Sequence, residues 1–387
     1  MNFFDDFARW AADFCLAGAF FGCLYTAVAS VLTLRFGRDR DGPGGEPHPS
    51  PVPVTVLMPL CGEEPGLDSR LRALCGQNYP APVQILCAVH DANDPTIAVV
   101  AKVAAELPHA NIEWQIDPRL HGRNLKMSNL MNVLGRARHD VFIMIDSDII
   151  VGPDHLARVV GELHHPNVGA VTCLYTGVAS GGLWAKLSAK STNLHFLPSV
   201  IVGLSSRLAQ PCFGSTIALT RQTLEQIGGL KPFVDHLWDD YAIGQAVRAA
   251  GLQVRVSNMT VGHVCVERSG REFFAYQLRN ARTIASIDPI GYLGAVIVHP
   301  LALALLAILL GAGQPAFAMT GLALAGRMVL CGCVTRRFGV SSSYWLLPLH
   351  DLASFAVYFM SFFGGTVLWR GQRYRVQSDG TLLQASR

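Results

Sequence analysis

Apolar residues dominate both ends of the chain, whereas the middle alternates short apolar runs with mixed polar segments. Residues 11–34 are apolar almost throughout and stop at the basic stretch 35–40. A bilayer span needs roughly 20 apolar residues, so this pattern predicts one transmembrane helix with a basic flank. A cleaved signal peptide is the alternative, which the preceding Asp5 and Asp6 and the long apolar core disfavour.

The middle of the chain has the pattern of an α/β domain. Runs typical of buried strands alternate with segments of helical spacing, which predicts a mostly parallel sheet with helices on both faces. The expected strands are residues 54–60, 83–89, 111–116, 141–145 and 168–175, and the expected helices include 96–107 and 128–138.

The last third of the chain is again apolar. Residues 271–289 mix aromatic, aliphatic and basic side chains, which predicts an interfacial amphipathic helix, with a core-packing helix as the alternative. Three segments, each long enough to span, follow at residues 290–310, 315–334 and 344–368. The expected organisation is an anchor (1–36), a Pro/Gly linker (37–53), an α/β domain (54–270), the interfacial segment (271–289), membrane segments (290–368) and a basic tail (369–387).

Basic residues decide the expected orientation in the membrane. The stretches 35–40 and 335–339 both favour the cytoplasmic side, so the middle domain is expected in the cytoplasm. A third full crossing would send the basic residues 369–375 outside, against the same rule. Pro348 and Asp351 interrupt the last apolar segment, so we expect it to be broken or interfacial and the tail to be cytoplasmic.

Composition narrows the class of protein. Half of the residues are apolar and 15% are charged, with a mean hydropathy of +0.31, which is too apolar for an ordinary soluble domain. Basic residues exceed acidic ones by only three, which excludes nucleic acid as an expected partner. Ten cysteines without any C-x-x-C pair indicate small buried residues in a reducing compartment rather than disulfides or a zinc site.

Two carboxylates, Asp146 and Asp148, directly follow the apolar run 141–145. Like charges this close raise each other's pKa unless a positive charge lies between them. A divalent cation held by hard oxygen ligands, with a diphosphate on its other side, would explain the pair. A solvated turn is the alternative, since aspartate is common there.

Three more polar clusters lie at strand ends or helix starts. In parallel sheets, ligands bind beyond the carboxyl ends of the strands, and Asp146 and Asp148 stand at such an end. Aspartates at turns and helix N-caps are the alternative explanation for each cluster taken singly. The clusters are Asp91 with Asp94, Lys126 between Asn124 and Asn129, and Asp239 with Asp240.

Taken together and in this order, the motifs resemble the inverting GT-A glycosyltransferases that include cellulose and dolichyl-phosphate-mannose synthases. The chain is more similar to the ceramide glucosyltransferase group, and within it to bacterial hopanoid biosynthesis glycosyltransferases. The resemblance covers nearly the whole chain and implies a Rossmann-like GT-A domain bracketed by transmembrane helices. It rests on VHDANDP, GRNLKMSNL, MIDSDIIV, CFGSTIALTRQTLEQIGGL, WDDYAIGQAV and RNARTI.

The resemblance also implies roles for individual residues. Asp91 would bind the uracil or ribose of a UDP-sugar, and Lys126 would lie near the phosphates. Asp146 and Asp148 would hold a divalent cation, Mg²⁺ or Mn²⁺. Asp240 would be the general base that accepts a proton from the attacking hydroxyl.

The family's Gln/Arg-x-x-Arg-Trp element corresponds to the region of Gln277, Arg279 and Arg282, which would lie near the donor. Asn280 stands where tryptophan is expected, which leaves the roles of Gln277 and Arg279 open and argues against a processive polymer synthase.

Three further residues have alternative interpretations. Asp239 would raise the pKa of its neighbour Asp240 or bind the donor. His263, expected on a loop, would be a further metal ligand, a phosphate contact or a structural residue. Gly214 lies in the segment that resembles the family's sugar- and acceptor-facing loop, or is a turn residue.

The function implied by the resemblance is a lipid glycosyltransferase in the bacterial inner membrane. The donor would be UDP-N-acetylglucosamine and the acceptor bacteriohopanetetrol, with ceramide and UDP-glucose as the runner-up pair. A catalytically silent membrane scaffold and a transporter component are the alternatives from other classes. The intact aspartates disfavour the scaffold, and the large α/β region disfavours the transporter.

Overall fold

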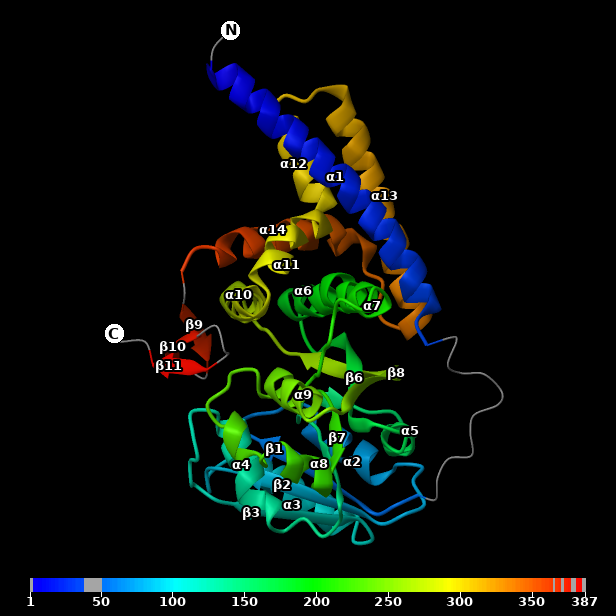
Figure 1. Cartoon of the computed structure of the whole chain (residues 1–387), viewed down its shortest axis with the longest axis vertical. Coiled ribbons are helices and arrows are strands. Elements are labelled where there is room, and N and C mark those ends of the chain that lie inside the picture. The colour runs from blue at the N-terminus through cyan, green and yellow to red at the C-terminus, as the bar shows by residue number, and fades with distance from the viewer. Residues whose placement is uncertain (1–2, 38–50, 365, 370–371, 377–380, 385–387) are drawn as a thin grey trace.

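The computed structural model describes residues 3–37, 51–364, 366–369, 372–376 and 381–384. Figure 1 shows helices of membrane type at one end of the molecule and an α/β domain at the other, with a layer of helices between them. Most of the predicted linker and much of the predicted basic tail lie outside the described residues.

The α/β domain is built on an eight-stranded sheet in the order β3-β2-β1-β4-β7-β6-β8-β5. Strands β1 to β4 are parallel where they pair, β7 runs antiparallel to both of its neighbours, and β8 is parallel to β6. The predicted α/β class and the predicted strands are therefore confirmed. The strands are β1 (Val54–Leu60), β2 (Val83–Val89), β3 (Asn111–Ile116), β4 (Val141–Met144), β5 (Ile149–Ile150), β6 (Val168–Ala179), β7 (Ile217–Thr220) and β8 (Gln253–Cys265).

Helices cover both faces of this sheet because its central strands are apolar on both sides. In β4, Ile143 packs into the core on one face, while Phe142 and Met144 pack into the core on the other. Each fully buried side chain of this size contributes roughly 1.5–3 kcal/mol. The helices of the domain are α2 (Leu67–Cys75), α3 (Thr96–Glu106), α4 (Leu125–Leu134), α5 (His155–Leu163), α8 (Arg221–Gln226), η3 (Lys231–Phe233) and α9 (Asp239–Ala249).

Helix α4 begins three residues before the helix predicted at 128–138. Its start is fixed by Asn124, whose side-chain oxygen accepts a hydrogen bond of 3.2 Å from the backbone N–H of Met127. This N-cap satisfies one of the free donors of the first turn. It also places Lys126 in that first turn.

A layer of helices separates the sheet from the membrane-type helices (Figure 1). Its members are α6 (Leu183–Ser191), the π-helical turn η2 (Thr192–Phe196), α7 (Leu197–Ser205) and α10 (Gly270–Ile287). Asn193 ties η2 to β6, since its amide accepts from Gly177 N at 2.8 Å and donates to Gly177 O at 2.9 Å. Helix α10 was predicted from the sequence, whereas the α6–η2–α7 stretch was not.

Among the described residues, two helices are long and apolar enough to cross a membrane, Asp6–Arg35 within α1 (Phe3–Arg35) and α13 (Gln314–Phe338). A third candidate is bent by 70° between Pro289–Val298 and Pro300–Leu309. These segments comprise α11 (Pro289–Gly294), η4 (Ala295–Val298) and α12 (Pro300–Leu309).

The last apolar segment, residues 344–368, is interrupted, as its polar residues predict. It forms η5 (Tyr344–Leu346) and α14 (Leu347–Ser361) and then turns into a strand. Helix α14 is too short to count as a span and lies across the foot of the membrane-type helices in Figure 1. The strands β9 (Thr366–Trp369), β10 (Gln372–Val376) and β11 (Leu382–Gln384) form a small antiparallel sheet.

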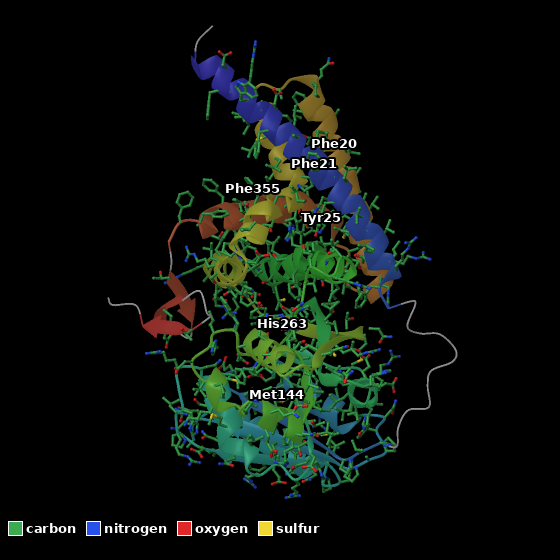
Figure 2. All side chains as sticks on the ribbon, viewed as in Figure 1. Phe20, Phe21, Tyr25, Met144, His263 and Phe355 are labelled. Carbon is green, nitrogen blue, oxygen red and sulfur yellow. The ribbon has the colours of Figure 1, made fainter. Side chains whose placement is uncertain are left out.

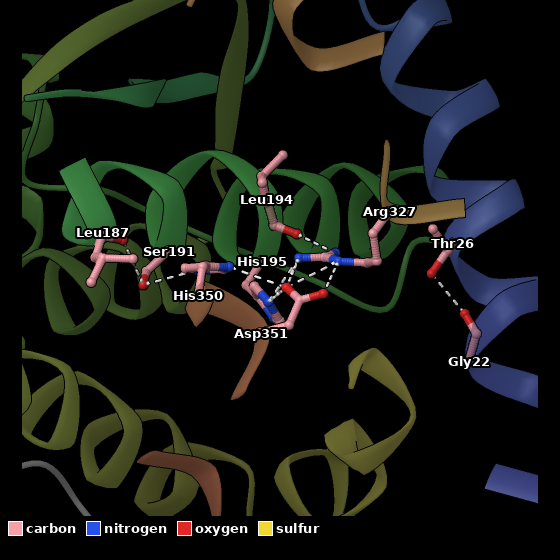
Figure 3. A network of polar contacts seen from close by, with 9 residues as sticks. All are labelled: Gly22, Thr26, Leu187, Ser191, Leu194, His195, Arg327, His350 and Asp351. Carbon is pink, nitrogen blue, oxygen red and sulfur yellow. Dashed lines mark hydrogen bonds and ion pairs between the residues drawn. The ribbon is translucent and has the colours of Figure 1, made fainter. Parts of the chain in front are cut away.

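A buried polar network joins these layers around Arg327 of α13 (Figure 3). Its guanidinium donates to both carboxylate oxygens of Asp351 on α14, at 2.8 and 2.9 Å. It also donates to the backbone oxygen of Leu194 at 3.0 Å and lies 2.9 Å from Nε2 of His195, both in η2. Arg327 and Asp351 are 3% and 1% exposed, so the pair is a buried link between the membrane-type helices and η2.

Candidate functional site

The candidate site lies beyond the carboxyl end of β4, where the first turns of α4 and α9 meet. Lys126 comes from α4, Asp146 follows β4 directly, and Asp239 and Asp240 open α9. Asp239 and Asp240 are thus the first residues of the helix rather than residues before it. The chain topology therefore brings together residues that lie more than one hundred positions apart.

Lys126 is the centre of this cluster. Its Nζ lies 2.8 Å from Oδ1 of Asp146 and 3.1 Å from Oδ2 of Asp239. The other oxygen of Asp239 accepts a hydrogen bond of 3.1 Å from the side-chain amide of Asn124. The N-cap of α4 thus also fixes the start of α9.

Gly214 brings Asp240 to the same point. Its backbone N–H donates to Oδ2 of Asp240 at 2.8 Å, and Tyr241 N–H donates to Oδ1, also at 2.8 Å. A Cβ on Gly214 would lie 2.9 Å from both Asp146 Oδ2 and Lys126 Nζ. A side chain at this position would therefore displace the charged ends of Asp146 and Lys126.

The carboxylates of the cluster have shifted pKa values. Burial, together with the charges of Asp148 and Asp239, outweighs Lys126 and raises the pKa of Asp146 to about 7. Burial and the adjacent Asp239 likewise raise the pKa of Asp240. Burial opposes the charged form of Lys126, but the surrounding carboxylates raise its pKa, so it remains a cation. The cluster therefore contains more carboxyl groups than the single positive charge of Lys126 can neutralise.

Asp148 lies beside His263 rather than beside Lys126. Its Oδ2 lies 3.2 Å from Nε2 of His263, and its backbone oxygen accepts from Val264 N–H at 3.0 Å. Partial loss of water around Asp148 opposes its ionisation, but His263 and Arg70 hold its pKa below the usual value. Burial also opposes the charged form of His263, yet Tyr276 and Asp148 raise its pKa well above normal.

The prediction that His263 lies on a loop is wrong. The residue belongs to the long strand β8, where it pairs with Ile149 of β5. Figure 2 places it between α9 and the helix layer. Because His263 lies in a strand, its pairing with Ile149 of β5 fixes its position beside Asp148.

Two residues that were not predicted from the sequence, Arg70 and Glu64, support the loop between the two carboxylates. Arg70 of α2 donates to the backbone oxygen of Ser147, and the Ser147 hydroxyl donates to Oε1 of Glu64 at 2.6 Å. Arg70 is 5% exposed, and its guanidinium lies 3.6 Å from Glu64. Glu64 follows β1 at the same edge of the sheet, so the rule for parallel sheets pointed to it.

The arrangement of Asp146 and Asp148 fits a divalent cation. Their side chains are 33% and 47% exposed, so they are open to a ligand. Oδ1 of Asp148 is itself buried and has no hydrogen-bond partner among the described residues. Hard carboxylate oxygens of this kind suit Mg²⁺ or Mn²⁺.

A second set of ligand-type side chains fits a metal less well. Ligand atoms of His195, His350 and Asp351 lie within 4.8 Å of one another. Arg327 already donates to both oxygens of Asp351 and lies 2.9 Å from the nitrogen of His195. The guanidinium charge of Arg327 would repel a metal ion there, and Arg327 itself already neutralises Asp351.

The other residues predicted to bind the UDP-sugar donor lie outside the cluster around Lys126. Asp91 is exposed and accepts from Asn93 N–H at 2.9 Å in the loop after β2. Gln277 donates to Ser188 on α6 at 3.2 Å. Their proposed contacts with a donor stay predictions.

Two arginines of α10 are also engaged elsewhere. The Arg279 guanidinium lies 5.0 Å from the centre of the Tyr276 ring. Arg282 donates to the backbone oxygens of Phe363 and Thr366 at 2.7 and 2.6 Å, which ties α10 to the segment after α14. Their roles toward a donor likewise stay predictions.

The cysteines differ in their burial. None of the ten forms a disulfide among the described residues, and six of them are buried. Cys61, in the loop after β1, is exposed, so the expectation of small buried residues does not hold for every cysteine.

Comparison with known proteins identifies the family. Residues 15–382 match glycosyl transferase family 21, and this chain belongs to that family. The expected GT-A class, a mostly parallel sheet flanked by helices and bracketed by apolar helices, agrees with this membership.

Individual relatives are more distant. A ceramide glucosyltransferase 1 of Caenorhabditis elegans is 22% identical over 61% of this chain and 51% of its own length. An N-acetylglucosaminyltransferase of Rhizobium meliloti is 27% identical over 42% of this chain and 38% of its own. The chain spans about half the length, or less, of the curated relatives it matches.

One solved structure covers most of the chain. The mannosyltransferase PcManGT from Pyrobaculum calidifontis, in complex with GDP-Man and Mn²⁺, aligns with 90% of this chain and 99% of its own. Its sequence identity is 21% and its TM-score is 0.48.

Proposed function

We propose that this member of family 21 transfers a sugar from a UDP-sugar to a hydroxyl group of a membrane lipid, with inversion at the anomeric carbon. The observation that carries this proposal is the meeting of Lys126, Asp146 and Asp240 around Gly214. One side of the cluster offers charges for a diphosphate, and the other offers a half-buried base, Asp240. The helix layer above it leads to the membrane-type helices (Figure 1).

Asp240 is the proposed general base. Both of its oxygens are oriented by backbone N–H groups, which leaves further lone pairs for a substrate hydroxyl. The lipid oxygen attacks the anomeric carbon while the bond from that carbon to the diphosphate breaks, and the hydroxyl proton passes to Asp240. A base placed in this way contributes on the order of 10²–10⁴-fold. A single displacement inverts the configuration.

The departing diphosphate would be stabilised on the opposite side. Lys126 provides a compact positive charge next to Asp146. Asp146 and Asp148 would hold the divalent cation, which, when bound, neutralises charge on the leaving group. Asp91 would bind the uracil or ribose, and His263 would hold Asp148 in place or join the cation's ligands.

The first proposed pair of substrates is UDP-N-acetylglucosamine and bacteriohopanetetrol in a bacterial inner membrane, with the α/β domain in the cytoplasm. The N-acetylglucosaminyltransferase relative supports this donor. The second pair is UDP-glucose and ceramide, which the ceramide glucosyltransferase relatives support.

The test uses the full chain in lipid nanodiscs with each of the two donors and each of the two lipids. Mass spectrometry of the extracted lipids measures the product. We expect one glycosylated lipid with the wild type and a fall in kcat of about 10²–10⁴-fold for Asp240→Asn. The matched control is Asp140→Asn, because Asp140 precedes β4 and lies at the other edge of the sheet. Full activity of Asp240→Asn, or no glycosylated lipid with any pair, would refute the proposed function.

A further inference from the structure

A row of aromatic rings lies beside the proposed base and cation site. Tyr175 of β6 stacks on Phe196 at the end of η2, with ring centres 4.6 Å apart, and meets Phe213 edge to face at 5.9 Å. Phe196 and Phe213 are 5.4 Å apart. His263 extends the row, 5.5 Å from Tyr175 and 6.3 Å from Tyr276 of α10. All five rings are half-buried.

This row connects directly to the charged groups of the site. Phe213 precedes Gly214, whose N–H donates to Asp240. The backbone of Phe213 is held by Thr172 of β6, whose hydroxyl accepts from Phe213 N–H at 2.9 Å. A molecule lying on the rings would therefore have one end beside the base.

The other end of the row continues into the membrane-type helices. Phe196 and Phe213 pack against a buried cluster of Leu174, Leu197 and Ile201. Leu32 and Phe36 at the end of α1, and Phe338 at the end of α13, pack against the same cluster. Apolar packing thus continues from the ends of two membrane-type helices to the half-buried rings beside Asp240.

Helix α10 bounds the row on its remaining side. Tyr276 faces His263, while the next residue, Gln277, bonds to Ser188 of α6. Figure 1 shows α10 and the α6–α7 stretch side by side between the sheet and the membrane-type helices, and Figure 2 places His263 just below them. A substrate from the bilayer has to pass this layer to reach Asp240.

We propose that Tyr175, Phe196, Phe213 and Tyr276 form an aromatic wall that binds the hydroxylated end of the lipid acceptor. This inference rests on the proposed function and adds the place where the acceptor binds. A lipid carries an apolar body and a polar end, so its path has to offer continuous apolar surface. Aromatic rings supply that surface, and the two tyrosines add hydroxyl groups for the polar end. The donor's diphosphate is expected at the charged cluster instead.

The test measures two KM values in nanodiscs, one for the lipid that the wild type glycosylates and one for the UDP-sugar. The variants are Phe196→Leu, which keeps an apolar side chain in η2, and Tyr175→Phe, which removes only a hydroxyl. The controls are Phe355→Leu and Tyr79→Phe. Phe355 lies on α14, well away from His263 in Figure 2, and the Tyr79 hydroxyl bonds to Val52 O near the start of β1.

We expect both wall variants to raise the KM for the lipid by roughly three- to tenfold, while the KM for the UDP-sugar stays within about twofold. The controls are expected to leave both values within about twofold. A lipid KM that does not move would overturn the wall, and so would a rise in the donor KM alone, because the rings would then bind the donor sugar. Both results require a wild type that transfers sugar, so they leave the proposed function standing.

Discussion

Replacing Arg327 with methionine tests whether the buried network joins the layers of the molecule. The change removes the donors to Asp351 and to the Leu194 backbone oxygen but keeps a long apolar side chain. Arg327 and Asp351 are almost wholly buried, so water cannot replace the lost partner. Breaking a buried ion pair by removing one partner typically costs about 3–5 kcal/mol, and we expect a fall of that size in the free energy of unfolding.

The assay is equilibrium unfolding by SDS in mixed micelles, followed by tryptophan fluorescence. Arg336→Met is the matched control, since Arg336 is exposed in the last turn of the same helix. A surface substitution of this kind is expected to change the free energy of unfolding by no more than about 0.5 kcal/mol.

A double variant separates charge from packing. The double variant, Arg327→Met with Asp351→Leu, leaves neither partner of the ion pair as an uncompensated charge. Its free energy of unfolding is therefore expected to be higher than that of Arg327→Met alone. The reasoning would be refuted if Arg327→Met matched the Arg336 control. The reasoning would also be refuted if the double variant lost as much free energy of unfolding as the two single variants together, because the two residues would then act independently.

The remaining predictions concern the site. Asp239→Asn removes a like charge that raises the pKa of Asp240, so the acid limb of the pH–rate profile, where protonation of the base lowers the rate, is expected to move to lower pH. Gly214→Ala places a Cβ 2.9 Å from a carboxylate oxygen of Asp146, and steady-state assays are expected to show about a 10²-fold loss of kcat/KM. Asp148→Asn is expected to raise the Mn²⁺ concentration for half-maximal rate by at least about tenfold, measured by titrating enzyme stripped with EDTA.

Each of these three has its own contrary result. An acid limb that stays in place or moves to higher pH would contradict the electrostatic account of Asp240. Gly152→Ala is the control for Gly214, since a Cβ at Gly152 would have no atom within 4 Å, and equal losses in the two variants would remove the close-approach argument. An unchanged Mn²⁺ requirement in Asp148→Asn would remove Asp148 from the proposed cation site.

Strands β1, β2, β4 and β6 were predictable because their residues are apolar on both faces of a buried sheet, whereas β8, whose residues are more polar, was not. The stretch α6–η2–α7 was not, because it carries buried polar residues such as Ser188 and Asn193 among apolar ones. Asn193 is satisfied by the backbone of β6, sixteen residues away, and that partner cannot be read from local periodicity. Arg327 is similar, since its position inside an apolar helix makes sense only beside Asp351.

The charged cluster was partly predictable for a topological reason. Asp146, Asp239 and Lys126 each follow a strand or open a helix, and such positions gather at one edge of a parallel sheet. That Lys126 would bridge the two aspartates depends on the N-cap of α4 and could not be derived from spacing. The support of the Asp146–Asp148 loop by Arg70 needed the packing of α2 against that loop.

The π-helical turn η2 makes this part of the chain sensitive to length as well as to composition. Consecutive residues of an α-helix differ by about 100° around the axis, and a π turn holds one residue more than an α turn. His195 meets Arg327, whereas the next residue, Phe196, stacks on Tyr175. Deleting a single residue between 192 and 196 would rotate all of α7 by about a quarter turn against α6. The deletion of one residue there would break both the contact of His195 with Arg327 and the stacking of Phe196 on Tyr175. Most single substitutions would disturb only one of these two contacts.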